Sequence, residues 1–145
     1  MAREVVLDAN VIVAQLDRAD VFSERAQALG RRLRDDGAEI VLLDVLVGEA
    51  ISVICRRARE RRSLQPNVDA ILATVRNWAE AGFVRWVGGE AKRVIGSILD
   101  VIEETGATLN FNDALLVVLQ REGLIDEVAS FDRGFDLLPD FRRIE

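Results

Sequence analysis

Short apolar runs alternate along this chain with longer segments of helical periodicity, and this alternation restricts the possible fold more than any other feature. Four runs, residues 4–7, 39–43, 83–87 and 126–131, have the length and composition of buried strands, and residues 141–145 are a fifth candidate. Strands that are apolar throughout are typical of a parallel sheet with helices on both faces. The sequence therefore predicts an α/β fold with a mainly parallel sheet.

The segments between these runs predict six helices. The first opens around Asn10, and the others span residues 21–36, 45–62, 65–82, 88–106 and 112–123. Asp44 is expected to cap the third helix, and the all-apolar run 114–119 is expected to be buried on several sides. With 145 residues, half of them hydrophobic, and neither a linker nor a repeat, residues 1–145 are expected to form one domain.

Four carboxylates stand beside apolar residues: Asp8 in VVLDAN, Glu49 in LVGEAI, Asp113 in NFNDALL and Asp132 in ASFDRGF. An unpaired carboxylate in apolar surroundings costs several kcal/mol or takes up a proton. Parallel sheets place their sites at the carboxyl ends of the strands, where Asp8 and Asp132 follow the first and fourth predicted strands. Glu49 and Asp113, near helix starts, can project toward the same edge, so a shared cation would explain all four.

Three of the four acids also have an ordinary structural interpretation. Asp8 suits the cap of the helix that follows it, and Asp132 suits a turn. Asp113 suits the first turn of a helix capped by Asn110 or Asn112.

Glu49 is harder to explain structurally, because the nearest cation on its helix face, Arg56, lies two turns away. Gly48 beside it costs about 1 kcal/mol within a helix, which a close backbone approach or a crowded site would explain.

The metal expected at such a site follows from the available ligands. The chain has no histidine and one cysteine, so it cannot form a zinc site of the usual nitrogen and sulfur type. Carboxylate oxygens suit Mg²⁺ or Mn²⁺. Cys55 lies in an apolar helical run and is expected to be a buried, reduced thiol, since no histidine exists to activate it.

The charge of the chain limits its interactions with nucleic acid. The net charge of −6 excludes a generally basic nucleic-acid binder, although not a local site. All but one of the 19 basic residues are arginine, so phosphate contacts would use guanidinium groups. The N-terminal segment has an acidic residue by position 4 and no apolar leader, and no segment reaches membrane-spanning length, so a cytoplasmic protein is expected.

The motifs VVLDANVIVA, GEA, LNFNDALLVVLQREG and EVASFDRGFDLLPDF, in this order, resemble the PIN-domain ribonucleases, particularly the VapC-like toxins of toxin–antitoxin pairs. The resemblance spans nearly the whole chain. It implies a three-layer α/β/α sandwich with a five-stranded parallel sheet, frequent homodimers and Mg²⁺- or Mn²⁺-dependent cleavage of RNA. It also implies a cognate antitoxin as a partner.

The same resemblance makes Asp8, Glu49, Asp113 and Asp132 the acidic quartet. Asp8 and Asp113 are assigned as direct metal ligands, and Glu49 and Asp132 as residues that hold metal-bound waters or a second ion. Asn10 occupies the family's small polar position, where it would fix Asp8 or donate to the scissile phosphate.

The basic tract has two possible interpretations, and one further acid has none. The basic tract Arg56, Arg57, Arg59, Arg61 and Arg62 is either a clamp for the RNA backbone, with Arg56 nearest the acids, or a solvated helix end stabilised by the dipole. Asp136 receives no assigned role.

Rival families fit the sequence less well. A haloacid-dehalogenase-type phosphatase needs a second Asp where this chain has Asn10, and it needs a suitably placed lysine, whereas Lys92 is the only lysine and lies in an unrelated helix. A response-regulator receiver fails for a similar reason. A PIN-like scaffold that binds RNA or protein without cutting remains an alternative, as does RNA processing in place of a toxin role.

Overall fold

The computed structural model describes residues 2–60 and 66–145. Their strands form one five-stranded sheet in the order β3-β2-β1-β4-β5, in which every neighbouring pair of strands is parallel. The strands are β1 (Glu4–Leu7), β2 (Glu39–Leu43), β3 (Val84–Arg85), β4 (Glu127–Ala129) and β5 (Arg143–Ile144). The central strand β1 pairs Val6 with Val41 on one side and with Val128 on the other. The predicted α/β fold with a parallel sheet of about five strands is thus confirmed.

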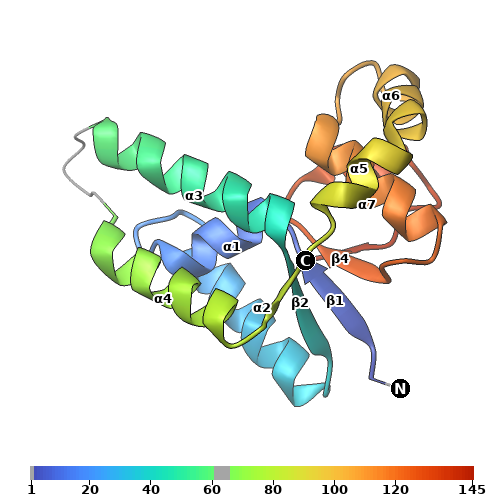
Figure 1. Cartoon of the computed structure of the whole chain (residues 1–145). Helices are drawn as coiled ribbons and strands as arrows, with labels where there is room; N and C mark the ends of the chain where they lie inside the picture. The colour runs from blue at the N-terminus through green and yellow to red at the C-terminus, as the bar shows by residue number, and fades with distance from the viewer. Residues whose placement is uncertain (1, 61–65) are drawn as a thin grey trace.

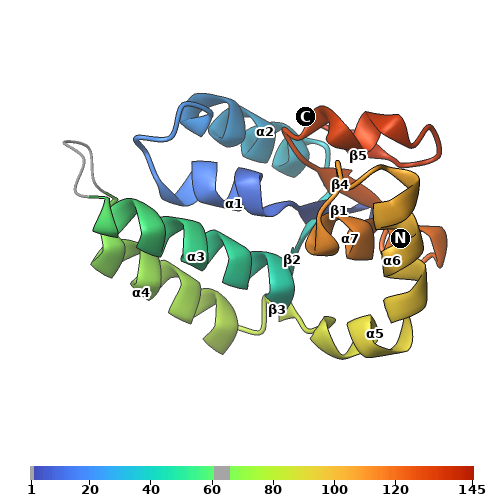
Figure 2. The ribbon, with the colours of Figure 1, turned by 90° about the horizontal axis from the view of Figure 1, so that it is seen from above.

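Helices cover both faces of the sheet, as a sheet of apolar strands requires. They are α1 (Ala9–Leu16), α2 (Ser23–Asp35), α3 (Asp44–Arg59), α4 (Val68–Glu80), α5 (Gly88–Arg93), α6 (Ile95–Glu104) and α7 (Phe111–Arg121), and a short 3-10 helix, η1, spans Arg133–Leu137. Helices α1 to α4 lie to one side of the sheet and α5 to α7 to the other, which gives the three layers seen in Figures 1 and 2.

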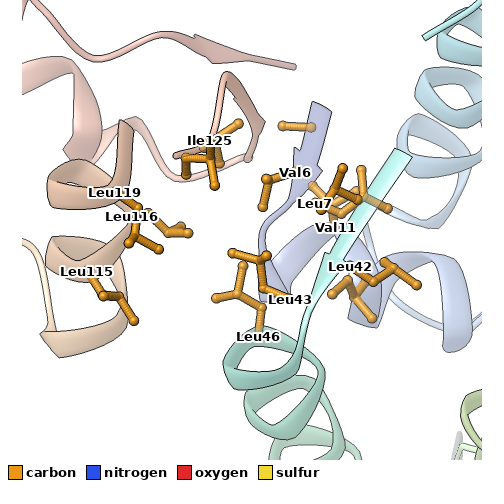
Figure 3. Close-up of a cluster of buried hydrophobic side chains, with 14 of the residues drawn as sticks. Val6, Leu7, Val11, Leu42, Leu43, Leu46, Leu115, Leu116, Leu119 and Ile125 are labelled. Carbon is orange, nitrogen blue, oxygen red and sulfur yellow. The ribbon is translucent and has the colours of Figure 1, made fainter. Parts of the chain in front are cut away.

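The core lies on both sides of β1 and β2, because successive strand residues point to opposite faces. Val6 and Leu43 point toward Leu115, Leu116 and Leu119 of α7, whereas Leu42 points the other way (Figure 3). Residues 114–119 are all buried, as predicted for this apolar run. Helix α7 is therefore anchored against the sheet, and its first turn is held at the strands' carboxyl edge.

Several element boundaries differ from the prediction. The helix expected over residues 88–106 is two helices, α5 and α6. Val94 is the C-cap of α5 and the N-cap of α6. The helix expected from residue 21 begins at Ser23, so Val21 and Phe22 precede it. Arg61, Arg62 and the helix start expected at Gln65 lie outside the described residues.

Two expectations about single residues are wrong. Cys55 is exposed, because α3 turns this position away from the core while Ile54 beside it is buried. Gly48 faces open space, with nothing within 4 Å of a Cβ built on it, so neither a close backbone approach nor crowding explains it.

The sequence predicts that Asp44 caps α3, and this prediction is wrong. Asp44 instead joins that helix to the segment after β3. It is the first residue of α3, which has Leu43 at the N-cap position. Its Oδ1 accepts from the backbone N–H of Val87 at 2.7 Å and its Oδ2 from that of Gly88 at 3.2 Å. One carboxylate thus satisfies two backbone donors where the chain leaves the sheet for α5.

None of the helices in the part of the chain that the structure describes is both long enough and apolar enough to cross a bilayer.

Replacing Asp44 with alanine is expected to lower the free energy of unfolding by about 2 kcal/mol, because two backbone N–H groups lose their acceptor. Asp44→Asn, which keeps one acceptor oxygen, should lose less. Urea denaturation of both variants measures the difference. Equal stability of the wild type and both variants would show that these hydrogen bonds do not hold the segment.

Candidate functional site

The register of the central strands places two polar residues side by side where the strands end. Leu7, the last residue of β1, pairs with Ala129, the last of β4. The next residues, Asp8 and Ser130, therefore leave the sheet together, and the Asp8 N–H donates to the Ala129 carbonyl at 2.9 Å. Both side chains are buried.

Asp8 is held by hydrogen bonds to both of its oxygens. Oδ1 accepts from the Ala9 N–H at 2.7 Å, which makes Asp8 the N-cap of α1. Oδ2 accepts from the Ser130 hydroxyl at 2.6 Å and from the Asn10 amide at 3.3 Å. The Asn10 amide oxygen in turn accepts from the Phe131 N–H at 3.1 Å. Asn10 thus fixes Asp8, which is one of the two roles expected for it.

Asp113 and Asn110 form a capping box at the start of α7. The Asn110 side chain accepts from the Asp113 N–H at 2.9 Å, and the Asp113 Oδ2 accepts from the Asn110 N–H at 3.0 Å. Asn112, the other candidate cap, instead donates from its amide to the Glu49 Oε2 at 3.0 Å. The start of α7 therefore positions one acid directly and a second acid, on α3, through Asn112.

Asp132 follows β4 and caps the short helix η1. Its Oδ1 accepts from the Gly134 N–H at 2.8 Å, and its own N–H donates to the Ser130 hydroxyl at 3.0 Å. The Ser130 oxygen therefore contacts both Asp8 and the Asp132 backbone, and it links the ends of β1 and β4.

A pocket of about 310 Å³ brings the four predicted acids together, and Asn10 with them. Its walls come from α1, the segment between α1 and α2, α3, the start of α7 and the segment after β4. The lining residues are Asp8, Ala9, Asn10, Val13, Asp20, Val21, Phe22, Glu49, Val53, Arg57, Asn110, Asp113 and Asp132.

The donor chemistry at this pocket suits a hard divalent cation. Within the described residues, none of the four carboxylates forms an ion pair, and no hydrogen bond reaches the second oxygen of Glu49, Asp113 or Asp132. The four acids line one pocket, but they do not converge on one point. In the described chain, no three or more His, Cys, Asp or Glu side chains are grouped closely enough to hold a metal ion. The oxygens are available, but the coordination sphere is not assembled.

Burial and mutual repulsion raise the pKa of two of the acids. Asp113 is 8% exposed, and desolvation, followed by the charges of Asp8, Asp132 and Glu49, raises its pKa to about 7 against the hydrogen bond from Asn110. Desolvation raises the pKa of Asp8 to about 6, and the charges of Glu49 and Asp132 add to this, whereas the Ser130 and Ala9 hydrogen bonds oppose it. A nearby positive charge would favour the ionised form of both groups.

Among the described residues of the basic tract, Arg57 lines the pocket and Arg56 does not. Arg56 is exposed and does not line the pocket. The Arg57 guanidinium binds Asp17 at 2.7 Å and Asp20 at 2.8 Å, so it fastens the segment after α1 to α3.

Asp136 also lies away from the pocket. It is exposed and forms a bidentate ion pair with Arg143 at 2.9 and 3.0 Å.

The sequence analysis assigns no role to Ser130, a possible helix cap to Asn112 and a place in the basic tract to Arg57, although each residue had a usable signal for its observed position. Ser130 occupies the position after β4 that the strand register sets beside Asp8. Asn112 precedes an acid at a helix start. Arg57 lies eight residues after Glu49, with Val53 between them, on one helix face, whereas Arg56 falls beside that face.

Comparison with known families identifies one domain model. The model for the PIN domain matches residues 5–140, which is nearly the whole chain. No curated protein sequence matches at a significant level.

Solved structures with the same fold include a toxin and two further structures, those of VapBC2 and FitAcB. Mycobacterium tuberculosis VapC20, described as a toxin that cleaves the sarcin–ricin loop, matches with a TM-score of 0.64 and 15% identity over 94% of this chain and 95% of that one. VapBC2 from Rickettsia felis, bound to a DNA fragment from its promoter, has a TM-score of 0.64 and 10% identity over 97% of each chain. FitAcB from Neisseria gonorrhoeae has a TM-score of 0.61 and 17% identity over 97% of this chain and 96% of that one. At these identities the likeness is one of fold.

Without metal, Asp113→Asn is expected to be more stable than wild type at pH 8, by on the order of 2 kcal/mol. Between about pH 4 and 7 the folded state retains the Asp113 proton that the unfolded chain has released, so the free energy of unfolding falls as the pH rises. An asparagine removes this cost and still offers an oxygen to the Asn110 N–H. Thermal or urea unfolding at pH 5 and pH 8 should show the gain mainly at pH 8.

Asp136→Asn is the matched control for this measurement, because Arg143 lowers the pKa of Asp136 and removing that carboxylate should give no gain at pH 8. An Asp113→Asn protein less stable than wild type at pH 8 would contradict the cost assigned to burying Asp113 beside the other acids.

Proposed function

Because the chain belongs to the PIN domain family, we propose that it is a divalent-metal-dependent endoribonuclease that hydrolyses RNA phosphodiester bonds at Asp8, Glu49, Asp113 and Asp132. The observation that carries this proposal is the pocket that all four acids line, although they come from four separate parts of the fold. Four carboxylates without ion pairs within the described residues are a costly arrangement unless a cation binds among them. Metal-assisted hydrolysis is the chemistry that such a site supports best.

The residues assigned to the metal follow from how each carboxylate is held. We assign Asp8 and Asp113 as direct ligands of Mg²⁺ or Mn²⁺, since they are the most buried acids of the pocket and burial raises the pKa of both. Glu49 and Asp132, each with one oxygen outside any hydrogen bond among the described residues, are assigned to metal-bound waters or a second ion. The oxygen-only donor set favours these ions over zinc.

When bound, the ion supplies a water acidified for in-line attack and offsets charge on the phosphate and the leaving oxygen. The chain's own residues supply the positioning. Ser130 and Asn10 hold the Asp8 Oδ2, and the capping box holds Asp113. Asp113, with a pKa of about 7, is partly protonated near neutral pH, and Asp8, with a pKa of about 6, takes up its proton at lower pH. These protons must leave as the cation binds, so metal affinity should rise with pH.

The biological role proposed with this activity is that of the toxin in a toxin–antitoxin pair, a cytoplasmic homodimer with a cognate antitoxin protein as partner. The fold neighbours support this role, because they include a VapC toxin that cleaves the sarcin–ricin loop and the complexes VapBC2 and FitAcB.

The isosteric variants Asp8→Asn, Glu49→Gln, Asp113→Asn and Asp132→Asn are each expected to lower cleavage by about a hundredfold or more, because each removes charge that holds the metal or its waters. The assay uses a mixed, structured RNA pool with Mg²⁺ or Mn²⁺, and circular dichroism checks that each variant folds. Asp136→Asn is the control, because Asp136 lies within η1, the helix that Asp132 caps, but outside the pocket, and this variant should cut as the wild type does.

Cleavage by the folded quartet variants at the wild-type rate would contradict the assigned site. If the wild type itself is inert with either metal, general nuclease activity is excluded. The PIN-like scaffold that binds RNA or protein without cutting would then be the better description.

A further inference from the structure

Two phenylalanine rings stack at the rim of the carboxylate pocket. Phe22, at the N-cap position of α2, lines the pocket, and Phe131 stands directly before Asp132. Their ring centroids are 5.0 Å apart with an angle of 30° between the planes. Segments separated by more than a hundred residues thus place an aromatic pair beside the acids.

A guanidinium group completes this cluster. The central carbon of the Arg25 guanidinium lies 4.8 Å from the Phe131 centroid and 5.2 Å from the Phe22 centroid. A cation at this distance from a ring is attracted to its π electrons. Arg25 and Phe131 therefore restrict the orientation of the Phe22 ring, which is a useful property for a surface that must be ready to bind.

These contacts leave part of Phe22 open to solvent. Phe22 is 38% exposed, and Val21 beside it, which also lines the pocket, is 89% exposed. An apolar wall of the pocket thus faces solvent next to the acids.

The charges around the pocket limit how RNA can be held there. Among the described residues, five carboxylates line it, those of the acidic quartet and Asp20, against one guanidinium, that of Arg57, which already binds Asp17 and Asp20. Phosphate contacts, which dominate the affinity of most nucleic-acid binders, therefore have few partners in this pocket. Stacking of a base on an aromatic ring requires no positive charge, and it tolerates any base because every base has a π face.

We propose, on the basis of the nuclease function above, that Phe22 stacks against the base of an unpaired nucleotide next to the scissile phosphate, with Phe131 and Arg25 holding the ring in place. A base paired within a duplex cannot offer its face in this way.

The test compares two RNA ligands of equal charge, an unstructured oligonucleotide and an abasic ribose-phosphate oligomer of the same length. Binding is measured by fluorescence anisotropy with Mg²⁺ in an Asp8→Asn background, so that the RNA is not cut during the measurement. Phe22→Leu keeps an apolar side chain without a π face, and Phe22→Trp keeps the π face. Phe83→Leu is the matched control, because Phe83 is 63% exposed and lies outside the pocket.

The parent is expected to bind the base-bearing RNA more tightly than the abasic oligomer, and Phe22→Leu to lose about tenfold of that affinity with abasic binding unchanged. Phe22→Trp and Phe83→Leu should retain the preference. The same loss for both oligomers, no loss, or a parent without any preference for bases would each overturn the proposal. No loss in Phe22→Leu would instead favour a protein partner for this wall.

If Phe22→Leu fails to fold, Phe22→Trp decides, because a folded Trp variant that no longer prefers the base-bearing RNA also overturns the proposal. Failure of the nuclease function is seen separately, as absence of cleavage by the wild type with intact Asp8.

Discussion

The cost of removing carboxylates from water, increased by their mutual repulsion, is the constraint on which the rest of this structure depends. Asp8 and Asp113 are both nearly buried, and their pKa values are raised first by desolvation and then by the charges of neighbouring acids. A fold selected for stability alone would gain by replacing such groups with apolar or amide side chains. The remainder of the fold can be understood as the framework that keeps these acids in place despite that cost.

The framework acts through hydrogen bonds that each use part of a carboxylate. Asp8 is the N-cap of α1, Asp113 belongs to the capping box that Asn110 begins in α7, and Asp132 is the N-cap of η1. The cap expected for Asp8 and the place in the first helical turn expected for Asp113 are therefore confirmed. The structural and functional interpretations do not exclude each other, since a cap fixes the side chain and leaves the remaining oxygen of Asp113 and Asp132 for a ligand. The buried helix α7 supplies the rigidity, because its apolar run packs on the sheet immediately after Asp113.

The parallel fold and the grouping of the acids could be predicted because strand length, apolar composition and the carboxyl-edge rule are properties of the chain itself. Three other features could not be predicted, because each depends on how tertiary packing rotates or interrupts a helix. They are the exposure of Cys55, the division of residues 88–106 at Val94 and the side of α3 that faces the pocket. Arg57 shows this most clearly, since a rotation by one residue exchanges it with Arg56. The sequence predicts a cap at Asp44 because aspartate generally prefers that position. The backbone N–H of Val87, which donates to its carboxylate, lies 43 residues away along the chain.

The claim that these acids form a metal site is tested most directly by titrating the metal-free protein with Mn²⁺ and following the electron paramagnetic resonance signal of the free ion. We expect the wild type at pH 8 to remove one or two Mn²⁺ per chain from solution, and binding to weaken as the pH falls below about 7, where first Asp113 and then Asp8 become protonated. Asp113→Asn should bind much less and Asp136→Asn as much as wild type. A free-ion signal that rises from the first addition with the wild type would contradict a metal site at these acids.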